Sequence, residues 1–207
     1  MLKAIALNCT LKSGDEASST DLMIDLVARH LREHDVELVD TIRIASRNVK
    51  PGVSSDEGDG DEWPGIRARI LEADVLILGT PIWMGQPSSV CKRVLERMDA
   101  FLGETDERSR MPVTSKVAVV AVVGNEDGAH HVSAELYQAL ADVGWTIPAG
   151  ATSYWVGEAM GGTDFKDLDG IPDKVEQTAR ALASNAAHLA RLLKAQPYPG
   201  IAPKQDD

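Results

Sequence analysis

The sequence predicts a single α/β domain, doubly wound, in which a parallel sheet of five strands carries helices on both faces. Short runs rich in Val, Ile, Leu and Ala alternate along the chain with segments of helical period, and only 4% of the 207 residues are aromatic. Buried parallel strands have near-continuous aliphatic sequences, and their alternation with helices is typical of right-handed crossovers. We expect this domain to span 1–195, followed by a loose tail over 196–207.

Five apolar runs define the expected strands. Four cover 3–8, 36–42, 74–79 and 116–123, and the fifth lies within 145–157. Helical spacing predicts four helices whose inward residues are Met23, Leu26, Val27, His30 and Leu31, then Val90, Cys91, Val94, Leu95, Met98, Phe101 and Leu102, then Val132, Leu136, Leu140 and Val143, and finally Val175, Ala179, Leu182, Ala186, Leu189 and Leu193. We expect the second of these helices to run over 88–102. The acidic, Gly- and Ser-rich stretch 46–65 predicts a mobile surface loop before a helix near Trp63.

Charge and cysteine content exclude several classes of protein. A net charge of −11 repels nucleic-acid phosphates and anionic lipid surfaces. Two cysteines, Cys9 and Cys91, cannot supply a CxxC motif or a four-thiolate iron–sulfur cluster. The sequence shows neither a signal peptide nor an apolar run of membrane-spanning length, so we expect a cytoplasmic protein.

Three loops leave the carboxyl ends of the expected strands, where ligands bind in open α/β sheets. The first, "NCTLKSGDEASST" (8–20), offers hydroxyl groups, the Lys12 ammonium and the free amides of a helix N-terminus. These groups suit a phosphate monoester. An ordinary Ser/Thr-rich helix cap explains the same residues equally well.

The second loop, "GTPIWMGQP" (79–87), places Trp83 and Met84 between Pro81 and Gly85. Two interpretations stand side by side. In one, the indole and thioether form a flat, polarizable shelf for a planar ring. In the other, they fill core beneath the following helix.

The third loop, "GNEDGAHH" (124–131), combines glycines with two adjacent histidines. Neighbouring residues at a helix start point apart, so we expect solvated or capping histidines rather than a metal site. No string matches the phosphate-binding GxxxxGK[ST] motif or the dinucleotide-binding GxGxxG motif. Position 15, where a tyrosine phosphatase would need Arg, holds an Asp, and Gly79-Thr80 stand where a receiver domain would have an Asp.

With these loops in view, the sequence resembles the NAD(P)H-dependent FMN reductases and quinone reductases of the flavodoxin-like fold, over most of 1–193. "LNCTLKSGDEASST" is similar to the family's phosphate loop "NGSPRKGGNTS", and "TPIWMGQPSS" is similar to its flavin-contacting loop "TPIYFGSMS". The resemblance implies the strand order 2-1-3-4-5, FMN as cofactor, NADPH or NADH as co-substrate, and a quinone, free flavin or similar small molecule as electron acceptor. The residues it assigns to cofactor binding are Thr10, Lys12, Ser18, Ser19, Thr20, Pro81, Ile82, Trp83, Met84, Gly85, Gly124, Asn125, Asp127, Gly128 and His130. It names no catalytic side chain, although His130 is a candidate proton donor to a reduced quinone.

Two departures from the family pattern keep other functions open. Cys9 replaces a Gly, and Asp15 and Glu16 place two negative charges inside the phosphate loop, where they would oppose a phosphate unless they face solvent. A flavodoxin-type electron carrier is the main alternative, and a scaffold without flavin is the third. Because family members are usually dimers or tetramers, the resemblance also implies a homodimer or homotetramer, with Trp155 either at the contact or inside its own core.

Overall fold

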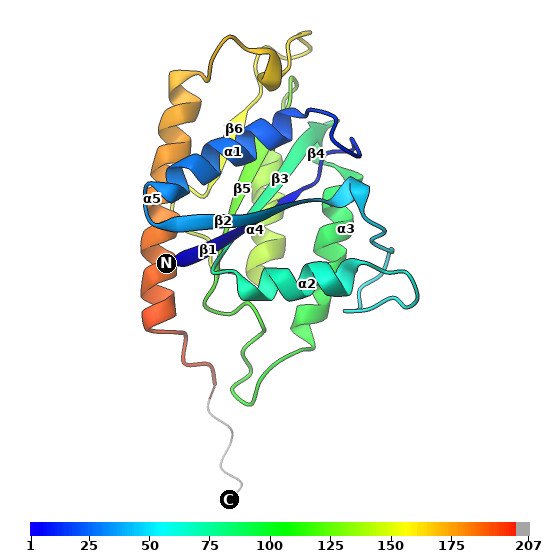
Figure 1. The fold of residues 1–207 in the computed structure, drawn as a ribbon, viewed down its shortest axis with the longest axis vertical. Coiled ribbons are helices and arrows are strands. Elements are labelled where there is room, and N and C mark those ends of the chain that lie inside the picture. Colours follow the sequence, from blue (N-terminus) through cyan, green and yellow to red (C-terminus); the bar gives the residue numbers. More distant parts are fainter. Residues whose placement is uncertain (202–207) are drawn as a thin grey trace, which may run out of the picture.

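The computed structural model describes residues 1–201 and forms an open α/β sheet flanked by helices (Figure 1). Its strands are β1 (Leu2–Asn8), β2 (Val36–Arg43), β3 (Val75–Trp83), β4 (Gln86–Pro87), β5 (Val117–Val123) and β6 (Thr152–Trp155). Its α-helices are α1 (Ser19–Arg32), α2 (Trp63–Glu72), α3 (Ser89–Met98), α4 (Ala129–Asp142) and α5 (Asp173–Ala195), with short 3-10 turns at Ile44–Ser46, Asp99–Leu102 and Phe165–Asp167.

Five parallel strands follow the order β2-β1-β3-β5-β6, and the short β4 pairs antiparallel with the end of β3. Counting only the parallel strands, this is the predicted order 2-1-3-4-5, so the fold prediction is confirmed. The register places Asn8 beside Gly79, Pro81 beside Val123, and Val123 beside Trp155. The carboxyl ends of four strands therefore meet along one edge.

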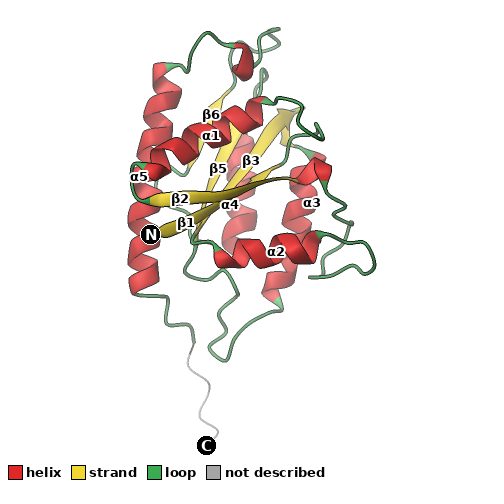
Figure 2. Ribbon diagram, viewed as in Figure 1, coloured by secondary structure: helices red, strands yellow, loops and turns green. Residues whose placement is uncertain are grey.

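Two hydrophobic layers lie on opposite faces of the sheet (Figure 2). Helices α1 and α5 pack on one face through residues such as Met23, Leu31 and Leu182. Helices α2, α3 and α4 cover the other face through residues such as Ile70 and Val94. Strand β5 is buried along its whole length, as expected for an aliphatic strand covered on both sides.

The second loop differs from the prediction because most of it is a β-hairpin. Strand β3 continues to Trp83, and Met84 and Gly85 form the turn into β4. Both turn residues have positive φ, 51° and 73°, which is the backbone of a two-residue hairpin turn that glycine favours. The loop is therefore a short antiparallel ribbon that extends beyond the parallel sheet.

The loop predicted over 46–65 ends at Glu62, because α2 begins at Trp63, and a buried ion pair anchors the segment before it. Arg97 of α3 contacts Asp61 at 2.7 Å, and both side chains are 0% exposed. Arg97 also donates to the carbonyl groups of Lys50 and Ser54, at 2.9 and 3.0 Å, and its guanidinium lies over the Trp63 ring. The sequence offered no periodicity by which this tertiary anchor could be recognised.

One end point also differs from the prediction. The helix expected over 88–102 ends at Met98 and continues as a 3-10 turn, so Leu102 is exposed instead of inward. In the predicted tail, the amide of Tyr198 donates to the Ser115 hydroxyl at 2.8 Å, and the amide of Ile201 donates to the Arg108 carbonyl at 2.8 Å. Residues 202–207, the rest of that tail, lie outside the described residues. Within 1–201, no helix combines the length and the apolar character needed to cross a bilayer.

Candidate functional site

A cavity of about 420 Å³ lies at the carboxyl edge of the sheet. It is bordered by the loop after β1, the β3–β4 hairpin, the loop after β5 and the segment after β6, and the course of these elements can be followed in Figure 1. Its walls are Thr10, Leu11, Lys12, Ser18, Ser19, Thr20, Pro81, Ile82, Trp83, Val123, Gly124, Asn125, Glu126, Trp155, Met160, Gly161, Asp164 and Phe165. Ten of the fifteen predicted site residues are therefore brought together here. The volume lies within the range of roughly 300–1,000 Å³ that is usual for small-molecule sites.

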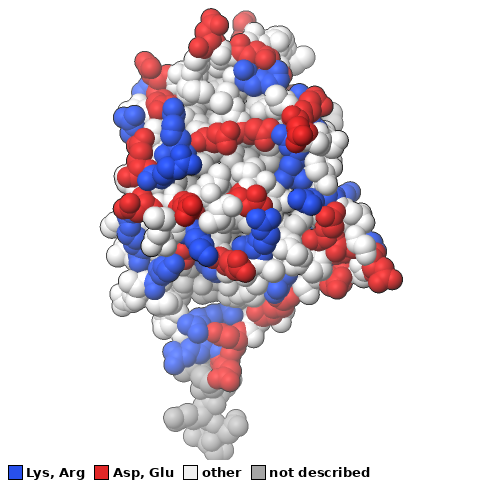
Figure 3. All heavy atoms as spheres, in the orientation of Figure 1, with Lys and Arg blue, Asp and Glu red and all other residues white. Residues whose placement is uncertain are grey.

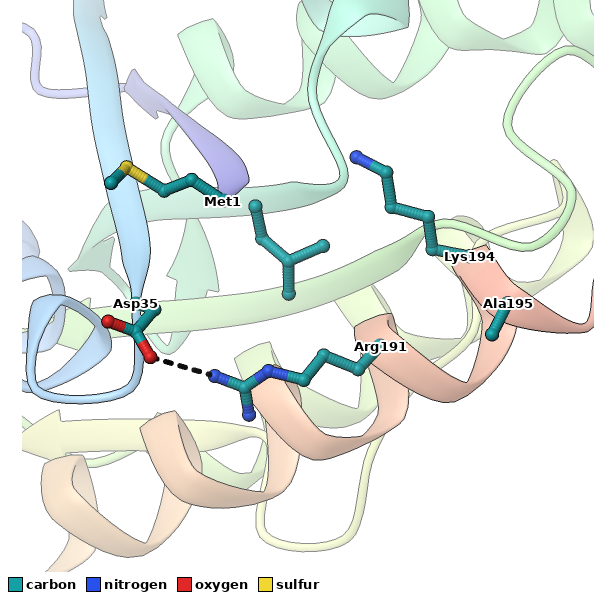
Figure 4. A pocket seen from close by; sticks show the side chains of 6 residues that line it. Met1, Asp35, Arg191, Lys194 and Ala195 are labelled. Carbon is teal, nitrogen blue, oxygen red and sulfur yellow. Dashed lines mark ion pairs between the residues drawn. The ribbon is translucent and has the colours of Figure 1, made fainter.

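A second hollow lies at the opposite edge of the sheet, where Met1 and the end of α5 meet (Figure 4). Its cations already have partners: Arg191 lies 3.9 Å from Asp35, and Lys194 lies 2.9 Å from Asp74. The hollow borders the amino ends of the strands, not the edge where α/β sheets bind ligands. The cavity at the carboxyl edge is therefore the candidate site.

The loop after β1 is organised by a polar network around Asp21. Ser18 caps α1 by accepting a hydrogen bond from the Asp21 amide at 3.2 Å, and its hydroxyl donates to the Asp21 carboxylate at 2.9 Å. Asn8 and Arg43 also donate to this carboxylate. Asp21 is thus neutralised by Arg43, and the first turn of α1 keeps its positive end.

Hydroxyl groups from the same loop face one end of the cavity. Thr10 and Thr20 are 4% and 1% exposed, and both line the cavity. Ser19 accepts a hydrogen bond from the Lys166 amide at 3.2 Å, which leaves its own proton for another acceptor. Together with the amides at the start of α1, these groups match the oxygen atoms of a phosphate monoester.

The two unusual carboxylates of this loop are both exposed, as the phosphate interpretation requires, but they differ in their contacts. Glu16 pairs with Lys12 at 3.0 Å. Asp15 has no ion pair among the described residues. The Lys12 ammonium, predicted to meet the phosphate, is therefore already bound to a carboxylate.

The hairpin supplies an apolar wall, but only part of the predicted shelf lies at the cavity. Pro81, Ile82 and Trp83 line it, and Trp83 remains 53% exposed. Met84 is 89% exposed and is not among the lining residues. The interpretation in which Trp83 and Met84 fill the core is wrong.

Four further predicted residues lie outside the cavity. Gly128 packs against the hairpin turn so closely that a Cβ there would stand 2.7 Å from the Gly85 Cα, so these two glycines join the second and third loops through backbone packing. Asp127 is exposed. His130 contacts the Tyr154 hydroxyl at 3.1 Å, beside β6, and is not placed to protonate a ligand in the cavity.

The segment after β6 was missed in the sequence and supplies much of the opposite wall. Trp155 packs on Phe165 with ring centroids 5.5 Å apart, and both line the cavity with Met160, Gly161 and Asp164. Asn125 fixes this segment, because its side chain donates to the Gly161 carbonyl at 2.9 Å and its carbonyl accepts from the Met160 amide at 2.7 Å. The signal was present: a Gly-rich stretch directly follows the last strand, at the same carboxyl edge.

Leu11 and Glu126 also line the cavity and were passed over inside loops that were otherwise recognised. One carboxylate oxygen of Glu126 is buried without a hydrogen-bond partner in the described part of the chain. The two cysteines are buried. Burial and the neighbouring Cys91 thiol raise the pKa of Cys9 well above its usual range, so Cys9 is protonated at neutral pH and is no nucleophile.

Neither a metal-binding cluster among the described side chains nor a concentrated basic patch on the face drawn in Figure 3 is present. No group of three or more His, Cys, Asp or Glu side chains within 1–201 is arranged to hold a metal ion. Figure 3 shows Lys and Arg side chains interspersed with Asp and Glu on the face it presents.

The donor set fits FMN. Hydroxyl groups and helix amides gather at one end of the cavity, and Pro81, Trp83, Val123, Trp155 and Phe165 form apolar walls suited to an aromatic ring system. These groups therefore suit a phosphate at one end of the cavity and a planar ring at the other.

The chain matches the model of the family described as NADPH-dependent FMN reductase over residues 2–159. This match confirms the family inferred from the loops and, with it, FMN as the cofactor and NAD(P)H as the co-substrate. Among solved structures, the chain is similar to an apo NADH:FMN oxidoreductase, with 15% identity, a TM-score of 0.65, and coverage of 98% of this chain and 95% of the other. At that identity the likeness supports the fold.

Two curated relatives are more similar in sequence. The chain is 30% identical to 8-demethyl-8-aminoriboflavin-5′-phosphate synthase of Streptomyces davaonensis, over 95% of this chain and 80% of that protein. A structure of RosB with the bound intermediate 8-demethyl-8-formylriboflavin-5′-phosphate has 30% identity and a TM-score of 0.85, covering 96% of this chain and 82% of the other. The chain is also 35% identical to a Mycobacterium bovis protein named divalent metal cation transporter MntH, over 94% of this chain but only 29% of that protein's length.

Proposed function

Since the chain belongs to the NADPH-dependent FMN reductase family, we propose that it is an NAD(P)H-dependent oxidoreductase of the FMN reductase or quinone reductase type, which acts on a small-molecule acceptor in the cytoplasm. One observation carries the proposal: the cavity joins a set of hydroxyl groups that suits a phosphate to a slot with aromatic walls. Bound FMN would supply the two-electron chemistry, taking hydride from the nicotinamide and passing the electrons on.

The protein would bind and orient the flavin and shield it from solvent. Thr10, Ser19 and Thr20 would hold the phosphate, while Trp83 and Trp155 would flank the ring. Trp83 is half exposed, which leaves room at the mouth of the cavity for a nicotinamide to approach. This access supports an enzyme over the alternative of a flavodoxin-type carrier.

Replacing the Thr10 hydroxyl tests the phosphate end. Thr10→Val keeps the shape of the side chain and should weaken FMN binding by about 1.5–3 kcal/mol if a charge-assisted hydrogen bond is lost. Thr146→Val, the same change far from the cavity, is the control. Fluorescence titration measures both, and equal affinities would contradict the assignment of the loop.

Reduction tests the reaction type. Under anaerobic conditions, NADH or NADPH should bleach the bound flavin by two electrons, and an added quinone or free flavin should restore its colour with ping-pong kinetics. If neither nucleotide reduces the flavin, and a chemical reductant instead accumulates a stable one-electron form, the carrier alternative is correct.

A second candidate function is modification of the flavin itself. It is favoured by the 30% identity to 8-demethyl-8-aminoriboflavin-5′-phosphate synthase and by the TM-score of 0.85 to the RosB structure with its bound flavin intermediate. Both values exceed those of the NADH:FMN oxidoreductase. Mass spectrometry of flavin released after turnover distinguishes the two: unchanged FMN supports the reductase, and an altered ring mass supports the modifying enzyme.

The oligomeric state of the protein remains a prediction. We propose a homodimer or homotetramer, since the exposed Trp83 and Met160 line the cavity, exposed Met84 follows Trp83 in the hairpin turn, and the three are candidates for an interface. Trp155 packs on Phe165 in its own chain, so it would reach a partner only through its exposed part. Light scattering at micromolar concentration measures the mass, and a strict monomer would contradict the proposal.

A further inference from the structure

Lys12 is the one residue with a cationic side chain among the described residues that line the cavity. A flavin phosphate at the start of α1 therefore has a single ammonium group to draw on. That group already contacts the Glu16 carboxylate at 3.0 Å and donates to the Ala17 carbonyl at 3.2 Å.

The loop backbone holds Glu16 in this place. The Gly14 amide donates to the Ser46 hydroxyl at 2.8 Å, and Arg43 donates to the Glu16 carbonyl at 2.6 Å. Glu16 is thus anchored on both sides by the end of β2 and the turn that follows it. Its side chain stays 63% exposed, so it can leave Lys12 without a change in the fold.

The other carboxylate near the phosphate position behaves differently. Asp21 is bonded by Arg43, Asn8 and Ser18, and its charge is compensated in the protein itself. Glu16 has Lys12 as its cation, and a phosphate would need the same cation.

Resting on the function proposed above, we propose that Glu16 competes with the flavin phosphate for Lys12 and thereby limits the affinity for FMN. The phosphate must displace one carboxylate and then remain close to it. FMN is therefore held as an exchangeable ligand, and the site discriminates less between phosphorylated and unphosphorylated flavin than its hydroxyl groups alone would allow.

The test compares dissociation constants for FMN and riboflavin, measured by fluorescence quenching at low ionic strength. Glu16→Gln should tighten FMN binding by about three- to tenfold, in line with the weak interaction of exposed charges, and leave riboflavin unchanged. Asp15→Asn is the matched control, because it removes the same charge from an exposed position without an ion pair, and its effect should be smaller.

A double-mutant cycle isolates the competition. In a Lys12→Met background, Glu16→Gln should tighten FMN binding much less, because there is no longer a cation to release. Equal effects of Glu16→Gln and Asp15→Asn, or equal tightening of FMN and riboflavin, would overturn the inference while leaving the flavin site in place. If no variant binds either flavin, the proposed function fails with it.

Discussion

The segment 46–65, rich in Gly, Asp, Glu and Ser, and the loop 8–20, rich in Ser and Thr, are both polar stretches, yet they are held in different ways. Each is tied to an arginine from a distant element, Arg97 in the first and Arg43 in the second. The Arg97–Asp61 pair is 0% exposed on both sides, whereas Arg43 and Asp21 are 15% and 31% exposed, and Lys12 and Glu16 are 37% and 63% exposed.

The difference in solvent exposure indicates which ion pairs stabilise the fold and which can take part in ligand binding. In a buried ion pair such as Arg97–Asp61, removing one partner leaves an unpaired buried charge, which costs several kcal/mol, so such a pair fixes its segment. A solvent-exposed ion pair such as Lys12–Glu16 contributes little to stability, but a charged ligand can replace one of its partners. The loop 8–20 combines a partly buried pair that shapes it with an exposed pair that a phosphate can open.

The largest expected effect on stability follows from breaking the buried Arg97–Asp61 pair. Arg97→Met leaves the Asp61 carboxylate buried without its cation and should lower the free energy of unfolding by about 3–5 kcal/mol. Arg47→Met is the control, since it removes an exposed pair with Glu62 whose side chains are 49% and 43% exposed. Urea denaturation measures both, and similar losses would contradict the distinction between the two environments.

Lowering the pH should destabilise the protein through the same Arg97–Asp61 pair. Burial alone would raise the pKa of Asp61, but hydrogen bonds from Arg97 and from the amides of Glu57, Trp63 and Lys50 outweigh it and hold this pKa well below its usual range. Because the folded pKa is depressed, the stabilisation is present above the unfolded pKa of about 3.9 and is lost as pH falls below it.

The measurement is the free energy of unfolding between neutral pH and pH 3. The wild type should lose stability as pH falls, and Asp61→Asn should lose less. Asp59→Asn, which removes an exposed carboxylate from the same segment, is the control and should leave the acid dependence unchanged. A steeper acid dependence in Asp61→Asn than in the wild type would refute the linkage.

An intermediate effect is expected at Arg43. Arg43→Met removes the cation of Asp21 and the donor to the Glu16 carbonyl, so it should cost about 1–2 kcal/mol of stability and weaken FMN binding as well. Arg69→Met, which removes the more exposed pair with Asp40, should leave FMN binding unchanged. A loss of stability without any loss of FMN affinity would show that Arg43 does not shape the phosphate end.

The contrast also explains what the sequence could predict. Aliphatic runs and helical spacing identified every parallel strand and most of the residues facing the core, because period and burial are local properties. Arg97–Asp61 and Arg43–Asp21 join positions 36 and 22 apart, and no pattern in one sequence marks such partners. The wall formed by Trp155 and Phe165 was predictable from the carboxyl-edge rule, but Trp155 was left open between a subunit contact and its own core, and Phe165 was not singled out.

The smallest expected effect on stability is at the exposed Lys12–Glu16 pair. It is also the sharpest test of the contrast between buried and exposed ion pairs. Lys12 and Glu16 form an exposed contact, so the entropy of fixing two long side chains nearly offsets their attraction, and Glu16→Gln should change the free energy of unfolding by less than about 0.5 kcal/mol. The same substitution is expected to tighten FMN binding, and no stability change of that size can account for such an increase. Urea denaturation of the flavin-free protein measures the first effect, with Asp15→Asn as the control. A loss of 2 kcal/mol or more would mean that Glu16 holds the loop together, and its carboxylate would then belong with Asp61 as a structural anchor.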